Sequence, residues 1–205
     1  MVKRDIIQIF PQTLMLTKYE DDLSEELRYV QSLEYTGLED NGNFQSKDTY
    51  LLRRPELAKL KKFVNDTLDY FTTQILQSTQ QIRTTQAWVT KNPPGSFHHP
   101  HIHENSIYSC CFYFTQNKDH PPIGYFDRNR NILQLHYEKI NLLNAQSFYL
   151  PCTAGEMVVF PSNLWHKVPV NKGKGDRLSL SMNTFTTNEL GSIGSLTHLN
   201  VNDLH

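Results

Sequence analysis

The sequence lacks the features that mark several classes of protein. Lys and Arg number 20 against 21 Asp and Glu, so a net charge of −1 provides no basic surface for nucleic acid or an anionic membrane. No apolar run reaches transmembrane length, and no signal-peptide core follows the N-terminus. The three cysteines are odd in number, and Cys110 and Cys111 are adjacent, which argues against a disulfide framework. We therefore expect a cytoplasmic protein with reduced, buried cysteines and with neither nucleic acid nor a membrane as a partner.

The order of the sequence patterns predicts the fold class. At 205 residues the chain has the length of one domain, so 1–205 is treated as a single domain. Apolar residues recur at helical spacing over 22–33 and 55–75. The later part changes to short β-rich runs separated by Pro, Gly and Asn: 84–90, 106–114, 123–127, 147–151, 156–161, 167–170 and 177–185. This order predicts a mainly β protein, in which a helical part (1–83) packs on one outer face of an antiparallel sandwich or barrel (84–187), followed by a C-terminal extension (188–205).

Histidine is concentrated in one short segment. Four of the nine histidines lie within 98–103, and His166 follows a later apolar run. Residues i and i+2 of a strand share a face, so His101 and His103 can point at one ion while Ile102 faces the core. Imidazole is the commonest side-chain ligand of transition metals. We interpret His101, His103 and His166 as a metal site.

The other two histidines of the segment, His98 and His99, are weaker candidates for metal ligands. His99 has the same parity as His101 and forms a competing pair with it, although Pro100 between them restricts that strand to an edge or to its first residue. His98 has the opposite parity, and we expect it in a solvated loop.

Two predicted strands each carry one polar and one apolar face. The alternation in 106–114 places Ser109, Cys111 and Tyr113 on one face, and that in 177–185 places Arg177, Ser179, Ser181 and Asn183 on one face. An arginine followed by hydroxyls suits a carboxylate, because a guanidinium grips it through two parallel hydrogen bonds. The alternative for the second strand is a sheet with a wet outer face, which would be favoured without the histidines.

Several motifs resemble the Fe(II)- and 2-oxoglutarate-dependent oxygenases, in particular the short oxygenases of phages and bacteria. They are HIH, SCCFYF, GEMVVFPSNLWHKV and RLSLSMN, with IIQIFPQTL, QAWVTKNPPGSFHHPHIHENS and YFDRNR extending the resemblance over most of the chain. The resemblance implies a double-stranded β-helix, the cupin-like jelly roll. It also implies Fe(II) on His101, His103 and His166, and 2-oxoglutarate with its far carboxylate held by three residues: Arg177, Tyr113 and Ser179.

The chain departs from the wider superfamily at the second ligand. His103 stands where that superfamily has Asp or Glu, and a neutral imidazole leaves the metal site with one negative charge fewer. Glu104 is the alternative ligand, but a residue at i+3 on a strand points away from His101, so its use would require a bulge.

The resemblance implies a dioxygenase that couples oxidative decarboxylation of 2-oxoglutarate to a hydroxylation, with O2 consumed and succinate and CO2 released. Its substrate is unidentified, either a small molecule or a protein side chain. Candidates for the mouth of the site are Trp88, Tyr125, Arg128 and Arg130, each with a surface or packing role as the alternative.

Two other functional classes stay open. One is a three-histidine metalloenzyme without 2-oxoglutarate, either a thiol-dioxygenase-like cupin or a zinc hydrolase. The other is a non-catalytic, metal-containing jelly-roll binding module. The sequence predicts no oligomeric state and leaves a homodimer open, as it does a phage-encoded protein acting in the host cytoplasm.

Overall fold

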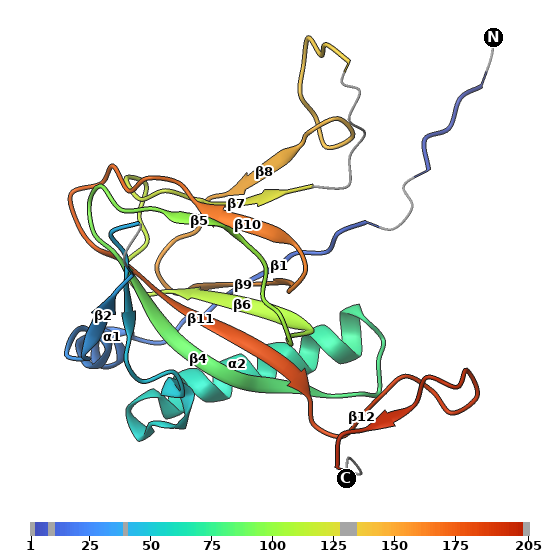
Figure 1. Ribbon diagram of the computed structural model, residues 1–205, viewed down its shortest axis with the longest axis horizontal. Coiled ribbons are helices and arrows are strands. Elements are labelled where there is room, and N and C mark those ends of the chain that lie inside the picture. The colour runs from blue at the N-terminus through green and yellow to red at the C-terminus, as the bar shows by residue number, and fades with distance from the viewer. Residues whose placement is uncertain (1–2, 8–10, 39–40, 128–134, 203–205) are drawn as a thin grey trace.

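The computed structural model describes residues 3–7, 11–38, 41–127 and 135–202, and they form a mainly β fold of two facing sheets (Figure 1). The larger sheet has seven antiparallel strands in the order β1 (Met15–Lys18), β9 (Glu156–Pro161), β6 (Tyr108–Tyr113), β11 (Arg177–Thr186), β4 (Ile82–Asn92), β3 (Phe44–Ser46) and β2 (Tyr35–Gly37). The smaller sheet has four, in the order β5 (His98–His101), β10 (Trp165–Val168), β7 (Ile123–Phe126) and β8 (Ser147–Leu150). A separate hairpin, β12 (Glu189–Leu190) and β13 (Leu199–Asn200), lies in the C-terminal segment.

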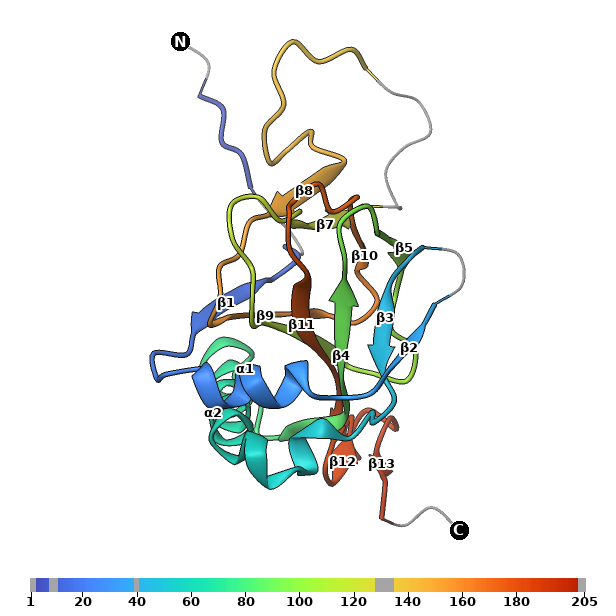
Figure 2. The ribbon, with the colours of Figure 1, turned by 90° about the vertical axis from the view of Figure 1, so that its left-hand side faces the viewer.

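The helices lie on the face of the larger sheet that is turned away from the smaller one (Figures 1 and 2). They are α1 (Ser24–Gln31) and α2 (Ala58–Tyr70), with the short turns η1 (Leu51–Arg53) and η2 (Pro55–Leu57) before α2 and the π-helical turn η3 (Phe71–Ile75) after it. Both helices begin later than the sequence patterns indicated. Ile75, the last residue of the predicted apolar stripe, is exposed. None of the helices in the described ranges is long and apolar enough to span a bilayer.

Strand alternation divides the core into two layers. Apolar residues on one face of β6 and β11 pack with α2: Cys110, Phe112, Leu178, Leu180 and Met182 against Leu60, Val64 and Leu68. Burying a side chain of this size contributes about 1.5–3 kcal/mol. The opposite face of β6 joins the layer between the sheets, where Cys111 and Tyr113 pack with Tyr125, Val158 and Phe160. All three cysteines are free and buried, as predicted.

The polar face of β11 points into the protein. Arg177 and Ser179 are 1% and 2% exposed, so the alternative of a wet outer face is wrong for this end of the strand. The cause is the second sheet, since the outer side of β11 is already covered by α2 and its apolar partners. Burying a polar side chain costs free energy unless it is hydrogen-bonded, so Arg177 and Ser179 each require a hydrogen-bond partner inside the protein.

Candidate metal centre and carboxylate clamp

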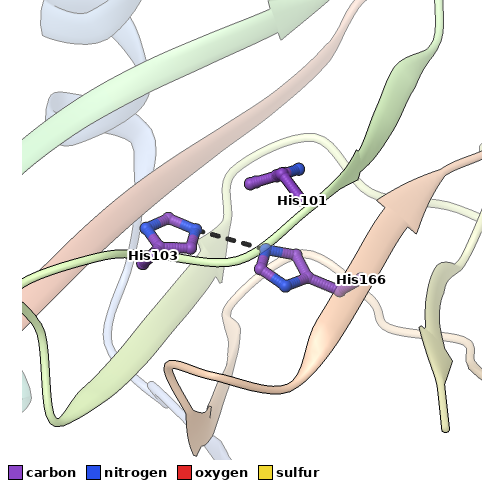
Figure 3. A group of neighbouring side chains, drawn as sticks. All are labelled: His101, His103 and His166. Carbon is purple, nitrogen blue, oxygen red and sulfur yellow. Dashed lines mark hydrogen bonds between the residues drawn. The ribbon is translucent and has the colours of Figure 1, made fainter. Parts of the chain in front are cut away.

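Three of the predicted ligands converge between the sheets (Figure 3). His101 ends β5 and lies directly opposite His166 of β10 in the antiparallel pairing. His103 lies two residues beyond the end of β5, and its main-chain N–H donates to the carbonyl of Ser162 at 2.9 Å. One ring nitrogen from each histidine lies within 4.8 Å of the others, and no further Asp, Glu, Cys or His of the described ranges belongs to this group.

Hydrogen bonds fix which nitrogen of each ring is available. The Nδ1 atoms of His101 and His166 lie 2.9 Å from the main-chain carbonyls of His99 and Leu164. A carbonyl only accepts, so each Nδ1 carries the proton and each Nε2 keeps its lone pair. His103 makes the same contact with a side chain, because its Nδ1 lies 2.6 Å from Oδ1 of Asn183. All three rings therefore present Nε2 as a ligand, oriented in the way that metal-binding histidines are held.

The electrostatics of the group suit a cation. The Nε2 atoms of His103 and His166 lie 3.2 Å apart, and two lone pairs at that distance repel unless a proton or a metal ion lies between them. Burial, with a smaller contribution from the neighbouring His101, lowers the pKa of His103 to about 4 and that of His166 to about 2. Burial lowers the pKa of His101 as well. Near neutral pH each ring is neutral and keeps one lone pair, so the donor set fits a divalent transition metal.

Glu104 does not share this arrangement. It is exposed in the turn after His103 and is not a member of the converging group. The predicted strand through His103 ends early, at His101, and Ile102 is only partly buried and lies outside both core clusters. His103 still reaches the other two rings, because its main chain bonds to Ser162 of the neighbouring β9 end.

A second cluster, the Arg177 cluster, consists of Arg177, Tyr113, Ser179 and Asn92. Arg177 begins β11, and its Nη1 donates to Oδ1 of Asn92 and to Oγ of Ser179, both at 3.3 Å. Its Nε and Nη2 are buried without a hydrogen-bond partner, as is the hydroxyl of Tyr113. The guanidinium carbon lies 5.1 Å from the centre of the Tyr113 ring.

The charge of Arg177 has no partner of opposite charge among the residues that the structure describes. In the described part of the protein, no Asp or Glu forms an ion pair with it. Burial raises the pKa of Tyr113 well above its ordinary value, so its hydroxyl stays a neutral donor. Two guanidinium donors and one phenol without partners match the acceptor pattern of a carboxylate. The structure thus brings together all three residues predicted to hold 2-oxoglutarate.

The remaining predictions have mixed outcomes. His98 was expected in a solvated loop, but it lies in β5 with its ring stacked on His101, the centres 4.5 Å apart. Burial lowers the pKa of His98 to about 3, and His101, His99 and Arg177 add to this effect. Trp88 stacks on His103 with the ring centres 5.8 Å apart. Tyr125 is a buried residue of the layer between the sheets, and Arg128 and Arg130 lie outside the described residues.

Residues 86–183 match a family model described as "Putative 2OG-Fe(II) oxygenase". None of the curated proteins matches the chain in sequence. Among solved structures, the chain is similar to HygX from Streptomyces hygroscopicus with nickel and 2-oxoglutarate bound, at 12% identity and a TM-score of 0.63, covering 86% of this chain and 84% of that one. It is similar to a Pseudomonas putida prolyl-4-hydroxylase at 13% identity and a TM-score of 0.57, covering 85% and 92%. It is also similar to the epimerase SnoN from nogalamycin biosynthesis at 11% identity and a TM-score of 0.63, covering 89% and 82%.

These comparisons identify the fold of the chain. Identities this low establish a shared fold and nothing finer. The match to the model of the 2OG-Fe(II) oxygenase family spans a little under half of the chain, and this stretch contains the three converging histidines and the whole Arg177 cluster. The chain has the double-stranded β-helix fold, as the sequence predicted.

Proposed function

We propose that this chain is an Fe(II)- and 2-oxoglutarate-dependent dioxygenase that hydroxylates a small molecule or a protein side chain. His101, His103 and His166 hold the metal through Nε2, and Arg177, Tyr113 and Ser179 hold the far carboxylate of 2-oxoglutarate. The observation that carries the proposal is the pairing of two features. Three imidazoles with free lone pairs converge on one point, and a buried guanidinium has two nitrogens without partners and, within the described ranges, no carboxylate in an ion pair with it.

The guanidinium distinguishes this function from the alternatives. A zinc hydrolase requires the three histidines, but it does not require a buried arginine without a counterion. A binding module with a structural metal has no use for it either, and a buried unpaired charge costs several kcal/mol unless a ligand compensates for it. The 2-oxo acid explains both features with one molecule.

The residues of the chain have three tasks in this reaction. The carbonyls of His99 and Leu164, with Asn183, hold the imidazoles so that every Nε2 points inward. Arg177 and Tyr113 bind and orient the dianion, which a positively charged interior also attracts. When bound, Fe(II) supplies the one-electron and O2 chemistry that couples oxidative decarboxylation of the keto acid to oxidation of a C–H bond.

Hydroxylation is the finer part of the proposal. The solved structures that share the fold include a prolyl-4-hydroxylase, and they also include an epimerase. The outcome in this superfold therefore depends on the substrate and its position, so hydroxylation is tested separately from the use of 2-oxoglutarate.

The test is an anaerobic titration of metal-free protein with Fe(II) and then 2-oxoglutarate. We expect one Fe(II) per chain, a visible metal-to-ligand charge-transfer band only after 2-oxoglutarate is added, and slow release of succinate when air is admitted without a substrate. Metal binding with no band and no succinate would contradict the proposal and leave the three-histidine metalloenzyme and the metal-containing binding module. Failure to bind metal would contradict the proposal and both of these alternatives.

A further inference from the structure

Asn92 accepts a hydrogen bond from one nitrogen of the Arg177 guanidinium. It is the last residue of β4 and lies directly opposite Arg177, the first residue of β11, in the antiparallel pairing. Both side chains are inaccessible, at 0% and 1% exposure. The Oδ1 atom of Asn92 accepts from Nη1 of Arg177 at 3.3 Å, while Nε and Nη2 have no partner. The contact therefore uses one donor of the guanidinium and leaves the opposite edge available.

The orientation of this contact is imposed by a short relay of buried amides. Nδ2 of Asn92 donates to Oδ1 of Asn43, and Nδ2 of Asn43 donates to the main-chain carbonyl of Phe97 at 2.5 Å. The relay ends on a carbonyl, which only accepts, and begins on a guanidinium, which only donates. Neither amide can be turned over without setting two acceptors or two donors against each other. Asn92 must therefore present its oxygen to Arg177.

Asn92 offers Arg177 a neutral amide oxygen and not the carboxylate of an aspartate of the same size. A carboxylate at this position would form an internal ion pair with the guanidinium and would compete with any anion that approaches from the other side. A neutral amide oxygen fixes the position of the guanidinium without neutralising its positive charge.

We propose that Asn92 is a positioning residue that determines the preference of the site for a 2-oxo acid with a second, distal carboxylate. It holds Arg177 by Nη1 and leaves its Nε and Nη2 donors, with their full charge, for that carboxylate. This inference rests on the proposed function, since it assigns Asn92 to the binding of 2-oxoglutarate. It goes beyond that function because it identifies the residue that makes binding depend on the distal carboxylate.

The experiment compares two ligands that differ only at the distal end. The ligands are 2-oxoglutarate and 2-oxopentanoate, which has the same carbon chain without the distal carboxylate, and binding is followed anaerobically by the charge-transfer band of the Fe(II)-loaded protein. We expect the wild-type protein to prefer 2-oxoglutarate by about 100-fold, because a charge-assisted pair of this kind is worth several kcal/mol and each 1.4 kcal/mol is tenfold. In Asn92→Asp this preference should fall to about tenfold or less, with the affinity for 2-oxopentanoate unchanged.

Two further variants keep the test decisive. Asn92→Leu has nearly the same shape and no acceptor, so it should lose about tenfold in 2-oxoglutarate affinity, and it is the deciding variant if Asn92→Asp does not fold. Asn117→Asp is the matched control for charge, because Asn117 is exposed and its Oδ1 only accepts, from the N–H of Asp119 at 2.8 Å. Its ligand preference should equal that of the wild-type protein.

The results separate failure of this inference from failure of the proposed function. A wild-type preference retained in both Asn92 variants at full Fe(II) occupancy would overturn the role of Asn92 and leave the 2-oxoglutarate site intact. An equal loss of both ligands would also overturn it, because a purely structural role affects the two alike. A wild-type protein that binds neither ligand would instead refute the proposed function.

Discussion

Replacing Arg177 should stabilise the metal-free protein and abolish its response to 2-oxoglutarate. The structure allows the first effect to be estimated for Arg177→Met, which keeps an unbranched side chain and removes the charge. Two buried donors, Nε and Nη2, have no partner, and each such group costs about 1–3 kcal/mol. Methionine removes this cost of about 2–6 kcal/mol, but it leaves the acceptors of Asn92 and Ser179 without the Nη1 donor, which costs about 1–2 kcal/mol.

The net expectation is that Arg177→Met raises the free energy of unfolding of the metal-free protein by about 0–5 kcal/mol. Water that reaches the guanidinium in solution reduces the effect toward the lower value. The variant should also lose its response to 2-oxoglutarate, because the charge that binds the distal carboxylate is gone. A ligand that binds only the native state stabilises it by RT ln(1 + [L]/Kd), so 2-oxoglutarate added with the metal should raise the Tm of the wild-type protein and leave that of the variant unchanged.

The assay is urea denaturation without metal, followed by thermal denaturation with the metal and 2-oxoglutarate. Arg83→Met is the matched control, because Arg83 is bound by both oxygens of Asp69 at 2.7 and 3.1 Å. That pair is partly exposed, so its removal should change stability by no more than about 1 kcal/mol, in the destabilising direction. If Arg177→Met lowers stability as Arg83→Met does, or if 2-oxoglutarate still raises its Tm, the reasoning about an uncompensated guanidinium is wrong.

Three further predictions concern the metal centre. His103→Ala should lose most Fe(II) affinity while Glu104→Ala keeps it, as measured by equilibrium titration; the reverse result would make Glu104 the second ligand. Asn183→Leu removes the acceptor that holds Nδ1 of His103, so Fe(II) affinity should fall by about 10–100-fold, and an unchanged affinity would mean that the ring is held by its packing alone. Stability of the metal-free protein should fall with acid. The native pKa values of His98, His103 and His166 lie at about 3, 4 and 2, below the usual value of about 6.5, so between pH 6.5 and 4 the unfolded chain binds more protons. The loss should exceed about 1.4 kcal/mol per pH unit in urea denaturation, since more than one histidine contributes, and a pH-independent free energy of unfolding over that range would contradict the burial of these rings.

Much of the fold could be predicted because alternation in a strand and spacing in a helix are local properties of the sequence. The parity of 106–114 separated Cys110 and Phe112, which lie in one core layer, from Cys111 and Tyr113, which lie in the other, and that of 177–185 placed Leu178, Leu180 and Met182 in the first layer. The hairpin of β2 and β3 was not predicted. Its strands have three residues each, and they lie in a turn-rich segment where no alternation can develop. Pairing with the edge of β4, a long-range contact, makes them strands.

The ligands could be predicted for a reason that was partly incorrect. His101 and His103 were assigned from the parity of one strand, but β5 ends at His101. His103 is brought to the other rings by the bond from its main chain to Ser162 and by the contact of its ring with Asn183. Both partners are distant in sequence, so neither contact could be read from the segment around the histidines.

The residues that support the site were not found from the sequence. Asn92 and Asn183 are asparagines in strands, where this residue type is depleted, and that depletion was the available signal. Asn183 shares a face with Arg177, so its parity was known, but its partner His103, which is 80 residues away in the sequence, was not. Asn92 precedes two prolines and lies beyond the end of the predicted strand 84–90. Its alignment with Arg177 depends on the register of β4 and β11, which single-strand patterns do not contain.

The two supporting asparagines have a common consequence for charge. One holds the metal ligand His103 and the other holds Arg177, and in both places the acceptor is a neutral amide oxygen and not a carboxylate. The three converging rings are neutral as well, because burial lowers their pKa values. The chain therefore supplies a cation in Arg177 and a site for a second cation among the histidines, and it supplies no anion to either in the described residues. Under the proposed function the missing negative charge comes from 2-oxoglutarate, whose two carboxylates are needed at the two ends of the site. This requirement explains why a molecule with only one carboxylate should bind poorly even though it can chelate the metal.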